Sequence, residues 1–457
     1  MMNNDAHENF SLEEWETCLK VLTFLKENPT QNPDNKIFSG LITKIYKKHK
    51  KQSRHESFKS KREHDCHLKK QTTLANTALK NQTLYHSFQA KELTASKLFA
   101  IPQRCYTCHK QYRVAHSFYH RLCSHCAEYQ YAMRFIDTDL SGRNVILTGG
   151  RIKVGFATAL KLLKSGANVC LTTRFPALAL YQFQQEPDYQ CWESRLFVYG
   201  LDLRSLRHIE EFIHFYKSKY HSLDILINNA AQTIQYTDQY YAPLLQLEQQ
   251  NAQTFLSTQH QQWISNEFSI SQTAHLLPLA DIQLSALSRF GQPIDNREKN
   301  SWNSSLEEIE LQELLEVNLI NHIAPYRLIQ GLKASMLNST FAEKFIINIT
   351  SSEGIFSYEN KTADHPHTNM TKAALNMLTR TSAQNLIQDQ IYMCAVDVGW
   401  ISTGVSESIR QKQFDRAMIP PLDSVDGASR ILHPIIEGLR GHHFSGVLLK
   451  DYKIHPW

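Results

Sequence analysis

The chain has 457 residues, a formal net charge of +5 and a hydrophobic content of 42%. This composition is enough for one large core of roughly 300 residues with small appendages. No apolar run approaches the roughly twenty residues that a membrane-spanning helix needs, which excludes a transmembrane segment. The N-terminus MMNNDAHENF also lacks the apolar core of a signal peptide. We therefore expect a soluble, cytoplasmic protein.

Residues 1–98 are predicted to form a helical, basic region. Apolar residues recur at helical spacing from Ser11 to Leu25, and Ser11 with Glu14 three residues later is a capping-box signature for the start of this helix. A second helix is predicted from about Asn35 to Lys50.

Positive charge is concentrated between Lys44 and Lys70, where eleven Lys or Arg residues accompany only three acids. Such a run often forms a solvated, partly helical arm, and this is the interpretation that we favour. The alternative is contact with an anionic partner, either nucleic acid or a membrane surface.

Residues 99–138 contain two CxxC turns separated by fourteen residues, which predicts a zinc-binding module. Two such turns aim four thiolates at one point and complete a tetrahedral site, so the metal has no open position and a structural role. A disulfide framework is the alternative, and the odd total of nine cysteines disfavours it. Four histidines nearby are available as substitute ligands but are not needed. The predicted ligands are Cys105, Cys108, Cys123 and Cys126, and the histidines are His109, His116, His120 and His125.

Residues 139–457 begin with the pattern of a dinucleotide-binding βαβ unit. Val145 to Leu147 is an apolar run typical of a buried strand, and the glycines after Thr148 allow a tight turn whose backbone can approach a pyrophosphate. The helix that begins near Lys153 then points its N-terminal amides at the phosphates. Asn168 to Thr172 is predicted as the next parallel strand.

More of the chain resembles the short-chain dehydrogenase/reductase family. The phosphate loop of that family is TGxxxGxG, and here Lys153 replaces the middle glycine, which is tolerable if the conformation there does not require glycine. Later markers follow in the family's order: Asp202 after a strand, Asn228 to Ala231 for its NNAG, Asn318 in EVNLI, Ser351 in INITSS, and Asp397 to Thr403 for its PG segment. The resemblance implies an α/β fold, a doubly wound parallel sheet of the Rossmann type that carries the small helical and zinc-binding N-terminal extension.

The resemblance also implies a set of cofactor contacts. Arg174 follows the second strand, where NAD-specific relatives carry an acid, so we expect NADP rather than NAD. A solvated Arg174 is the alternative. The residues expected at the cofactor are Thr148, Gly149, Arg151, Lys153, Val154, Gly155, Arg174, Asp202, Asn229, Ala230, Lys372, Gly399 and Thr403.

The catalytic position departs from the family pattern. Reductases of the family use Tyr-x-x-x-Lys on one helix face, and this chain keeps Lys372 but has Thr368 in place of the tyrosine. A threonine hydroxyl does not titrate near neutral pH and cannot replace the phenol as a proton donor. His365 could donate a proton, although Pro366 predicts that the helix starts there and that His365 caps it. Tyr358 is a weaker candidate. Ser351, Lys372 and Asn318 are the other expected catalytic residues.

An insertion of about 232–310 lies between two family markers and is rich in Gln, Leu and Tyr. Leu244, Leu245 and Leu247, and then Leu276, Leu277 and Leu279, suggest short amphipathic helices. Insertions after a strand often form lids or substrate-binding loops, and the alternatives are a contact in a homo-oligomer or an extra packing layer.

Two functions are consistent with these patterns. The first is an NADP-dependent oxidoreductase that acts on a small carbonyl or alcohol substrate of unknown identity with a non-standard proton donor. The second is a catalytically inactive dinucleotide-binding sensor or scaffold, in which the zinc module and the basic arm contact a partner. The retained Ser351 and Lys372 favour the first function, and Thr368 favours the second.

Overall fold

The computed structural model describes residues 9–83, 85, 98–256, 287–358 and 361–457. The chain divides into two compact units, Met1–Asp65 and Cys66–Trp457. The larger unit holds both the predicted zinc-binding module and the sheet. No helix among the described residues is long and apolar enough to cross a membrane.

The N-terminal helices begin where the sequence predicts. Helix α1 (Leu12–Glu27) carries the predicted capping box, in which the Ser11 hydroxyl accepts from the Glu14 amide and the Glu14 carboxylate accepts from the Ser11 amide. Helix α2 (Asn35–Gln71) is longer than predicted and includes the whole basic segment. The predicted helix, from about Asn35 to Lys50, was therefore too short. Lys, Arg, Gln and Glu are strong helix formers, and no proline interrupts the helix before Gln71.

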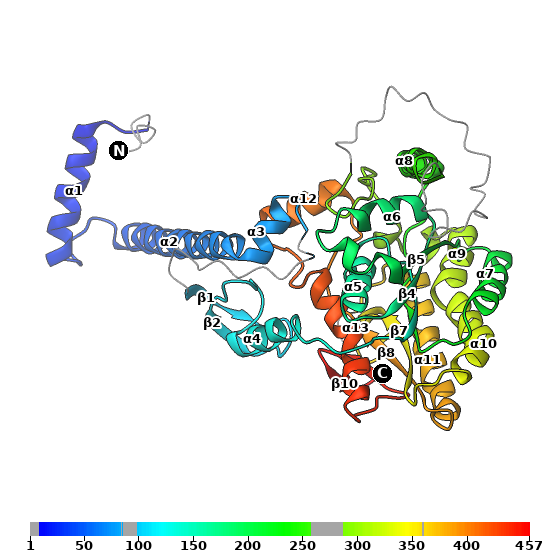
Figure 1. Ribbon diagram of the computed structural model, residues 1–457. Coiled ribbons are helices and arrows are strands. Elements are labelled where there is room, and N and C mark those ends of the chain that lie inside the picture. Colours follow the sequence, from blue (N-terminus) through cyan, green and yellow to red (C-terminus); the bar gives the residue numbers. More distant parts are fainter. Residues whose placement is uncertain (1–8, 84, 86–97, 257–286, 359–360) are drawn as a thin grey trace. The chain divides into compact units, whose positions relative to one another are not determined.

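The core of the larger unit is an eight-stranded sheet (Figure 1). Its order is β10-β9-β8-β7-β6-β3-β4-β5, with all strands parallel except β10. The strands are β3 (Asn144–Thr148), β4 (Asn168–Thr173), β5 (Leu196–Gly200), β6 (Ile225–Asn228), β7 (Lys344–Thr350), β8 (Ile391–Asp397), β9 (Leu448–Lys450) and β10 (Lys453–His455). This confirms the doubly wound sheet, with the strand order reversing between β3 and β6.

Helices cover both faces of this sheet and bury two apolar clusters against it. One face carries α5 (Lys153–Lys164), α6 (Pro176–Gln184) and α13 (Ser424–Leu439). The other carries α7 (Leu206–Lys219), α10 (Ala324–Leu337) and α11 (Pro366–Ile387), with α9 (Leu311–Asn318) and a π-helix (Leu319–Ile323) leading into α10. Because the parallel strands are covered on both sides, they are almost uniformly apolar, as in Val145 to Leu147.

The C-terminal part contains one helix and two short strands. Helix α13 continues through Pro434. Strand β9 adds to the sheet beside β8, and β10 pairs with β9 in antiparallel register. A three-residue strand has too little sequence for a periodic pattern.

The cysteine-rich module packs against the sheet domain through a buried ionic cluster. The module consists of β1 (Leu98–Arg104), β2 (Gln111–Val114) and α4 (Ser124–Met133), with α3 (Thr73–Leu79) beside it. The Arg134 guanidinium donates to Asp423 at 2.7 Å and to Asp426 at 2.9 Å, and Asp426 also accepts from the Tyr119 hydroxyl at 2.6 Å. Both acids begin α13, so the module is fixed to the helix that covers one face of the sheet.

The described part of the insertion contains one long helix. Helix α8 (Asp238–Leu256) includes Leu244, Leu245 and Leu247, and it packs on α6. Leu276, Leu277 and Leu279 lie outside the described residues. Helix α12 (Glu407–Asp415) follows the segment after β8.

Candidate functional site

A groove of about 420 Å³ lies where the strand order reverses. It is formed by the loops that follow β3, β4, β5, β6 and β7, and most of the residues expected at the cofactor line it. Those residues are Gly149, Arg151, Lys153, Val154, Gly155, Arg174, Asp202, Asn229, Ala230 and Lys372. Thr148, Gly399 and Thr403 are placed separately below.

The two loops at the strand reversal are tied together by hydrogen bonds. The Thr148 hydroxyl accepts from the amides of Asn229 and Ala230 at 3.0 and 3.1 Å, and the Asn229 side chain donates to the Thr148 and Gly149 carbonyls at 3.0 Å each. Gly149 has φ +68° and a Cβ there would lie 2.9 Å from the Ala230 backbone. A Cβ on Gly155 would meet the Gly149 carbonyl oxygen at 2.1 Å. These glycines are therefore required by close approach of the loops.

Lys153 occupies a backbone conformation that glycine favours. Its φ is +53°, in the left-handed region, which a lysine adopts only with strain. The conformation at this position therefore does favour glycine. The adjacent Val154 packs on Gly427 of α13, which holds the start of α5 in place. The strain at Lys153 costs about 1 kcal/mol, and the surrounding structure maintains it.

Arg174 follows β4 and lies beside an aromatic wall. Its guanidinium donates to the Tyr241 hydroxyl at 3.1 Å and lies 4.7 Å from the centre of that ring. Arg174 forms no ion pair with any described residue. Asp202, in the same groove, is bonded through both carboxylate oxygens to Arg204. Burial disfavours the Asp202 carboxylate, but the bonds from Arg204 outweigh it and lower its pKa below the ordinary value.

A second cavity, which we call the inner cavity, adjoins the groove at the carboxyl ends of β7 and β8. Ser351 and Lys372 line both spaces. The Lys372 ammonium donates to the Ile349 carbonyl at 2.8 Å. Burial lowers the pKa of Lys372 to about 8, although Glu353 and Asp397 partly oppose this effect. The ammonium is therefore poised to lose or gain a proton near neutral pH.

The residues expected in place of the tyrosine also line the inner cavity. Thr368 is buried and its hydroxyl has no hydrogen-bond partner among the described residues. His365 precedes α11, as Pro366 predicts, and its Nδ1 bonds the Trp302 carbonyl at 2.7 Å while its ring stacks on Trp302. Tyr358 lines the same cavity with 42% of its surface exposed.

Asn321, which the sequence did not single out, is more extensively hydrogen-bonded than Asn318, which is expected to be catalytic. The Asn318 amide bonds the Leu314 carbonyl of its own helix at 2.6 Å, and Asn318 lines none of the cavities described here. Asn321 is 1% exposed, bridges the Gln232 amide and carbonyl at 2.8 Å each, and donates to Thr371 beside Lys372. Asn321 lies within the π-helix, which shifts the register of the helix by one residue, so its contacts were beyond sequence spacing.

The segment after β8 completes the inner cavity. Gly399 has φ +83°, and Thr403 lies farther along the same lining. Tyr106, from the cysteine-rich module, also lines this cavity, and its hydroxyl accepts from the Trp400 amide at 2.9 Å. Burial raises the pKa of Tyr106, so it acts as a neutral phenol that positions Trp400. No local signal in the sequence connects Tyr106 to this segment.

The four predicted cysteines converge. Their sulfurs all lie within 4.8 Å of one another, and Cys108 and Cys123 are 3.8 Å apart. Tetrahedral zinc with Zn–S bonds of about 2.3 Å separates its sulfurs by about 3.8 Å. All nine cysteines are described and none forms a disulfide. His116 and His120 bond backbone groups instead, at Phe118 and Ile419 respectively.

Comparison with known protein families agrees with this geometry. Residues 143–277 match the model described as short chain dehydrogenase, and residues 298–421 match the model described as enoyl-(acyl carrier protein) reductase. The chain therefore belongs to the short-chain dehydrogenase/reductase family.

Individual relatives span different shares of the chain. The chain is similar to Uncharacterized protein R665 of Acanthamoeba polyphaga mimivirus, with 32% identity over 364 residues, which are 76% of this chain and 74% of that protein. It is 36% identical over 93 residues to the WW domain-containing oxidoreductase of Gallus gallus, covering 20% of this chain and 22% of that protein.

Two solved structures show similar chain traces at low sequence identity. The RhlG/NADP active-site complex of Pseudomonas aeruginosa has a TM-score of 0.45 and 19% identity, covering 68% of this chain and 95% of that one. The NADPH-bound carbonyl reductase from chicken fatty liver has a TM-score of 0.42 and 19% identity, covering 70% of this chain and 100% of that chain.

The strain at Lys153 predicts an unusual effect on stability. Lys153→Gly should raise the free energy of unfolding by about 1 kcal/mol, because glycine adopts positive φ without penalty. Equilibrium unfolding in urea measures the change. Lys217→Gly is the matched control, since this exposed lysine of α7 has ordinary helical geometry and its replacement should lower stability by about 1 kcal/mol. A loss of stability in both variants would contradict the strain argument.

Proposed function

We propose that the protein is an NADP-dependent oxidoreductase that interconverts a carbonyl compound and an alcohol. The observation that carries this proposal is that Lys372 and Ser351 line both the groove and the inner cavity. A cofactor in the groove would thus present its reactive end to a substrate beside these two side chains. The bound nicotinamide would supply the hydride.

The groove suits a dinucleotide along its length. The amides at the start of α5 and the glycine loop face the position of a diphosphate. Arg174 supplies a guanidinium at the end of β4, where it can hold a ribose 2′-phosphate in two hydrogen bonds. The nearby Asp202 is already bonded to Arg204, so it is not a free acceptor for a ribose hydroxyl. This arrangement favours NADP over NAD.

We assign the proton transfer to Lys372. Thr368 cannot release a proton near neutral pH, and the His365 Nδ1 is engaged by the Trp302 carbonyl. The Lys372 ammonium lies between the groove and the inner cavity, and burial makes its proton easily released. Lys153 also lines both spaces and has a lowered pKa, but Lys372 is the lysine of the family's Tyr-x-x-x-Lys pair. Ser351 would hold the substrate oxygen by a hydrogen bond, and Asn321 would keep the Gln232 segment and α11 in place.

A dinucleotide sensor without turnover is the second candidate. The observation that favours it is the buried, unpartnered Thr368 hydroxyl at the position where the family has its tyrosine. In that case the groove binds NADP in the same way, and the cysteine-rich module reports or transmits binding through Tyr106.

We also propose that the four cysteines hold one structural zinc ion. Their spacing suits tetrahedral coordination, and four sulfur ligands would leave no position for a substrate. The module has few buried apolar residues of its own, so a metal would supply stability that such a small unit lacks.

The NADP assignment predicts a selective loss of affinity. Arg174→Ala should weaken NADPH binding by about ten- to a hundredfold and leave NADH binding nearly unchanged, because only NADPH carries the 2′-phosphate. Titration of the protein with each cofactor, followed by fluorescence, measures both constants. Arg207→Ala, an exposed arginine of α7, is the control. Equal loss for the two cofactors, or no loss, would refute the assignment.

The role of Lys372 predicts the pH dependence of turnover. Reduction requires the ammonium, which is present below its pKa, so kcat should be level at low pH and fall as the pH rises through about 8. The measurement is NADPH oxidation across pH with an active substrate from a carbonyl panel. Lys372→Arg should remove this fall, and Lys361→Arg, which alters another lysine of the same cavity, should keep it. NADPH binding without turnover on the whole panel would instead favour the sensor.

The zinc assignment predicts the metal content of the purified protein. Protein prepared without chelator should contain about one equivalent of zinc. Cys108→Ser should bring the content well below one equivalent, whereas Cys191→Ser, an exposed cysteine outside the cluster, should not change it. Elemental analysis that finds no metal in the wild-type protein would overturn the assignment.

A further inference from the structure

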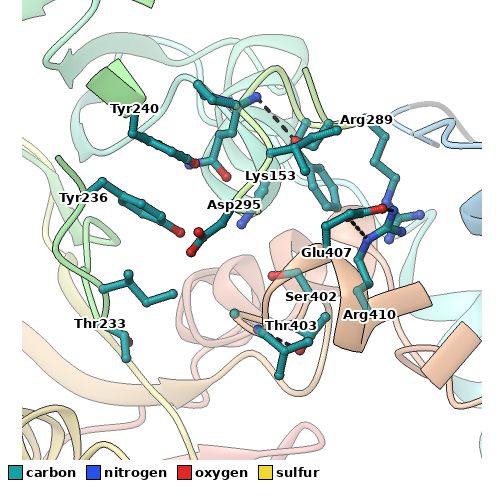
Figure 2. A pocket seen from close by; sticks show the side chains of 18 of the residues that line it. Lys153, Thr233, Tyr236, Tyr240, Arg289, Asp295, Ser402, Thr403, Glu407 and Arg410 are labelled. Carbon is teal, nitrogen blue, oxygen red and sulfur yellow. Dashed lines mark hydrogen bonds and ion pairs between the residues drawn. The ribbon is translucent and has the colours of Figure 1, made fainter. Parts of the chain in front are cut away.

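A third cavity, which we call the cationic cavity, lies beside the groove and has a volume of about 340 Å³. Most of its lining comes from four stretches of chain: the glycine loop, residues 231–244, residues 288–295 and residues 402–410. Figure 2 shows Lys153 and Arg289 in this cavity, with Tyr236 and Tyr240 on the opposite wall. A volume of this size suits a small metabolite.

Four cations that line the cavity form no ion pair with any residue that the structure describes. They are Arg151, Lys153, Arg174 and Arg289. The two acids that line the cavity are already engaged. Asp295 bonds Arg297, and Glu407 bonds Arg410 (Figure 2). Glu248 and Asp423 act on Arg151 and Arg289 from outside the lining. Arg151 donates only to the Gly291 carbonyl at 3.2 Å, and the Lys153 ammonium lies 5.2 Å from the Phe290 ring. The cavity therefore carries an excess of positive charge.

This excess is costly in the absence of an anion. Burial, together with repulsion from Arg289 and Arg151, lowers the pKa of Lys153 to about 8. Burial likewise lowers the pKa of Arg289 to about 10. The positive φ of Lys153 adds backbone strain at the same point. Charge repulsion and strain at one residue are typical of a binding site, where the ligand offsets them.

The cationic cavity adjoins both neighbouring spaces. It shares Arg151, Lys153 and Arg174 with the groove, and it shares Lys153, Thr233 and Trp302 with the inner cavity. Of these three spaces, Arg289 lines only the cationic cavity. A molecule with one end beside Ser351 and Lys372 can therefore extend past Lys153 toward Arg289.

The wall opposite the cations is polar and aromatic. Tyr236 and Tyr240 stack with their ring centres 3.8 Å apart, and Asp295 lies in the same lining. Phenol and carboxylate oxygens of this kind bond hydroxyl groups. The cavity thus combines a cationic end that suits a doubly charged anion with a wall that suits a polyol.

We infer that the cationic cavity binds the phosphate of the substrate, which is a small phosphorylated hydroxy-carbonyl compound or its alcohol. This inference rests on the proposed function, because it places the reacting carbon in the inner cavity. Lys153 and Arg289 hold the phosphate from two sides, and Arg151 adds charge at the boundary with the groove. A phosphate of the cofactor has the same chemistry, so the test separates the two sources.

Binding of inorganic phosphate to the NADPH-saturated, full-length protein is the direct test. Titration calorimetry near neutral pH, where Lys153 is protonated, should detect phosphate binding to the wild type. Arg289→Gln and Lys153→Gly should each weaken it by about tenfold or more. Arg416→Gln is the matched control, because Arg416 is exposed and lines none of these cavities. Arg289→Gln should keep the wild-type affinity for NADPH.

A second probe tests the polyol wall. Glycerol 3-phosphate should bind to the NADPH-saturated protein more tightly than inorganic phosphate and displace it, and glycerol should not displace phosphate. Tyr236→Phe should reduce the advantage of glycerol 3-phosphate without weakening the binding of phosphate itself.

Three results would overturn the inference while leaving the proposed function intact. The first is phosphate binding only when NADPH is absent, which would assign the cations to the cofactor. The second is an unchanged phosphate affinity in Arg289→Gln. The third is that the NADPH-saturated wild type binds no phosphate. Failure of the wild type to bind NADPH would instead refute the proposed function, and the inference with it.

Discussion

The close contact between the loops after β3 and β6 is the constraint on which the site depends. Thr148 and Asn229 exchange hydrogen bonds across the strand reversal, and Gly149 and Gly155 leave no room for a side chain between the loops. Because these groups satisfy one another, the loops keep a fixed shape without a ligand. The start of α5 is held by the same contact, and with it the direction in which its free amides point. The groove is thus built by backbone packing, and the side chains that distinguish this chain from others of its family are added around a rigid frame.

Lys153 shows how that frame accommodates a change that local preferences disfavour. Lys153 has a positive φ in the glycine loop, a conformation that glycine adopts more readily than lysine. A lysine there is strained, and its side chain is brought to the one point that the groove, the inner cavity and the cationic cavity share. A glycine would satisfy the backbone and leave this junction without charge. Lys153 therefore lowers local stability and places a cation at the centre of the site. Strain of this kind is expected where the requirements of function and folding conflict.

The sequence was sufficient for the parts of the structure that depend on local pattern. The capping box at Ser11, the βαβ unit around Gly149, the start of α11 at Pro366 and the convergence of the four cysteines follow from residues a few positions apart. The features that escaped prediction depend on distant contacts. Asn321 bonds Gln232 and Thr371 from within a π-helix that changes the helical register, and Tyr106 reaches Trp400 across almost three hundred residues. The place of Arg289 in the cationic cavity likewise becomes visible only when residues 288–295 are placed beside the glycine loop. Spacing rules carry no information about such neighbours.

The position of the cysteine-rich module follows from the same reasoning about distant contacts. Its helix α4 is joined to α13 through Arg134, whose two carboxylate partners begin that helix, and its first CxxC turn contains the tyrosine that fixes the Trp400 amide. Arg134 and Asp426 are buried and Asp423 is half-buried, so removal of either charge sign would leave the other uncompensated, which is strongly destabilising. The module is consequently held to the sheet at one end and to the wall of the inner cavity at the other. Any change that loosens the cysteine cluster must be transmitted to Tyr106, because Tyr106 lies between two of the cysteines, and from there to the segment that encloses the reacting groups.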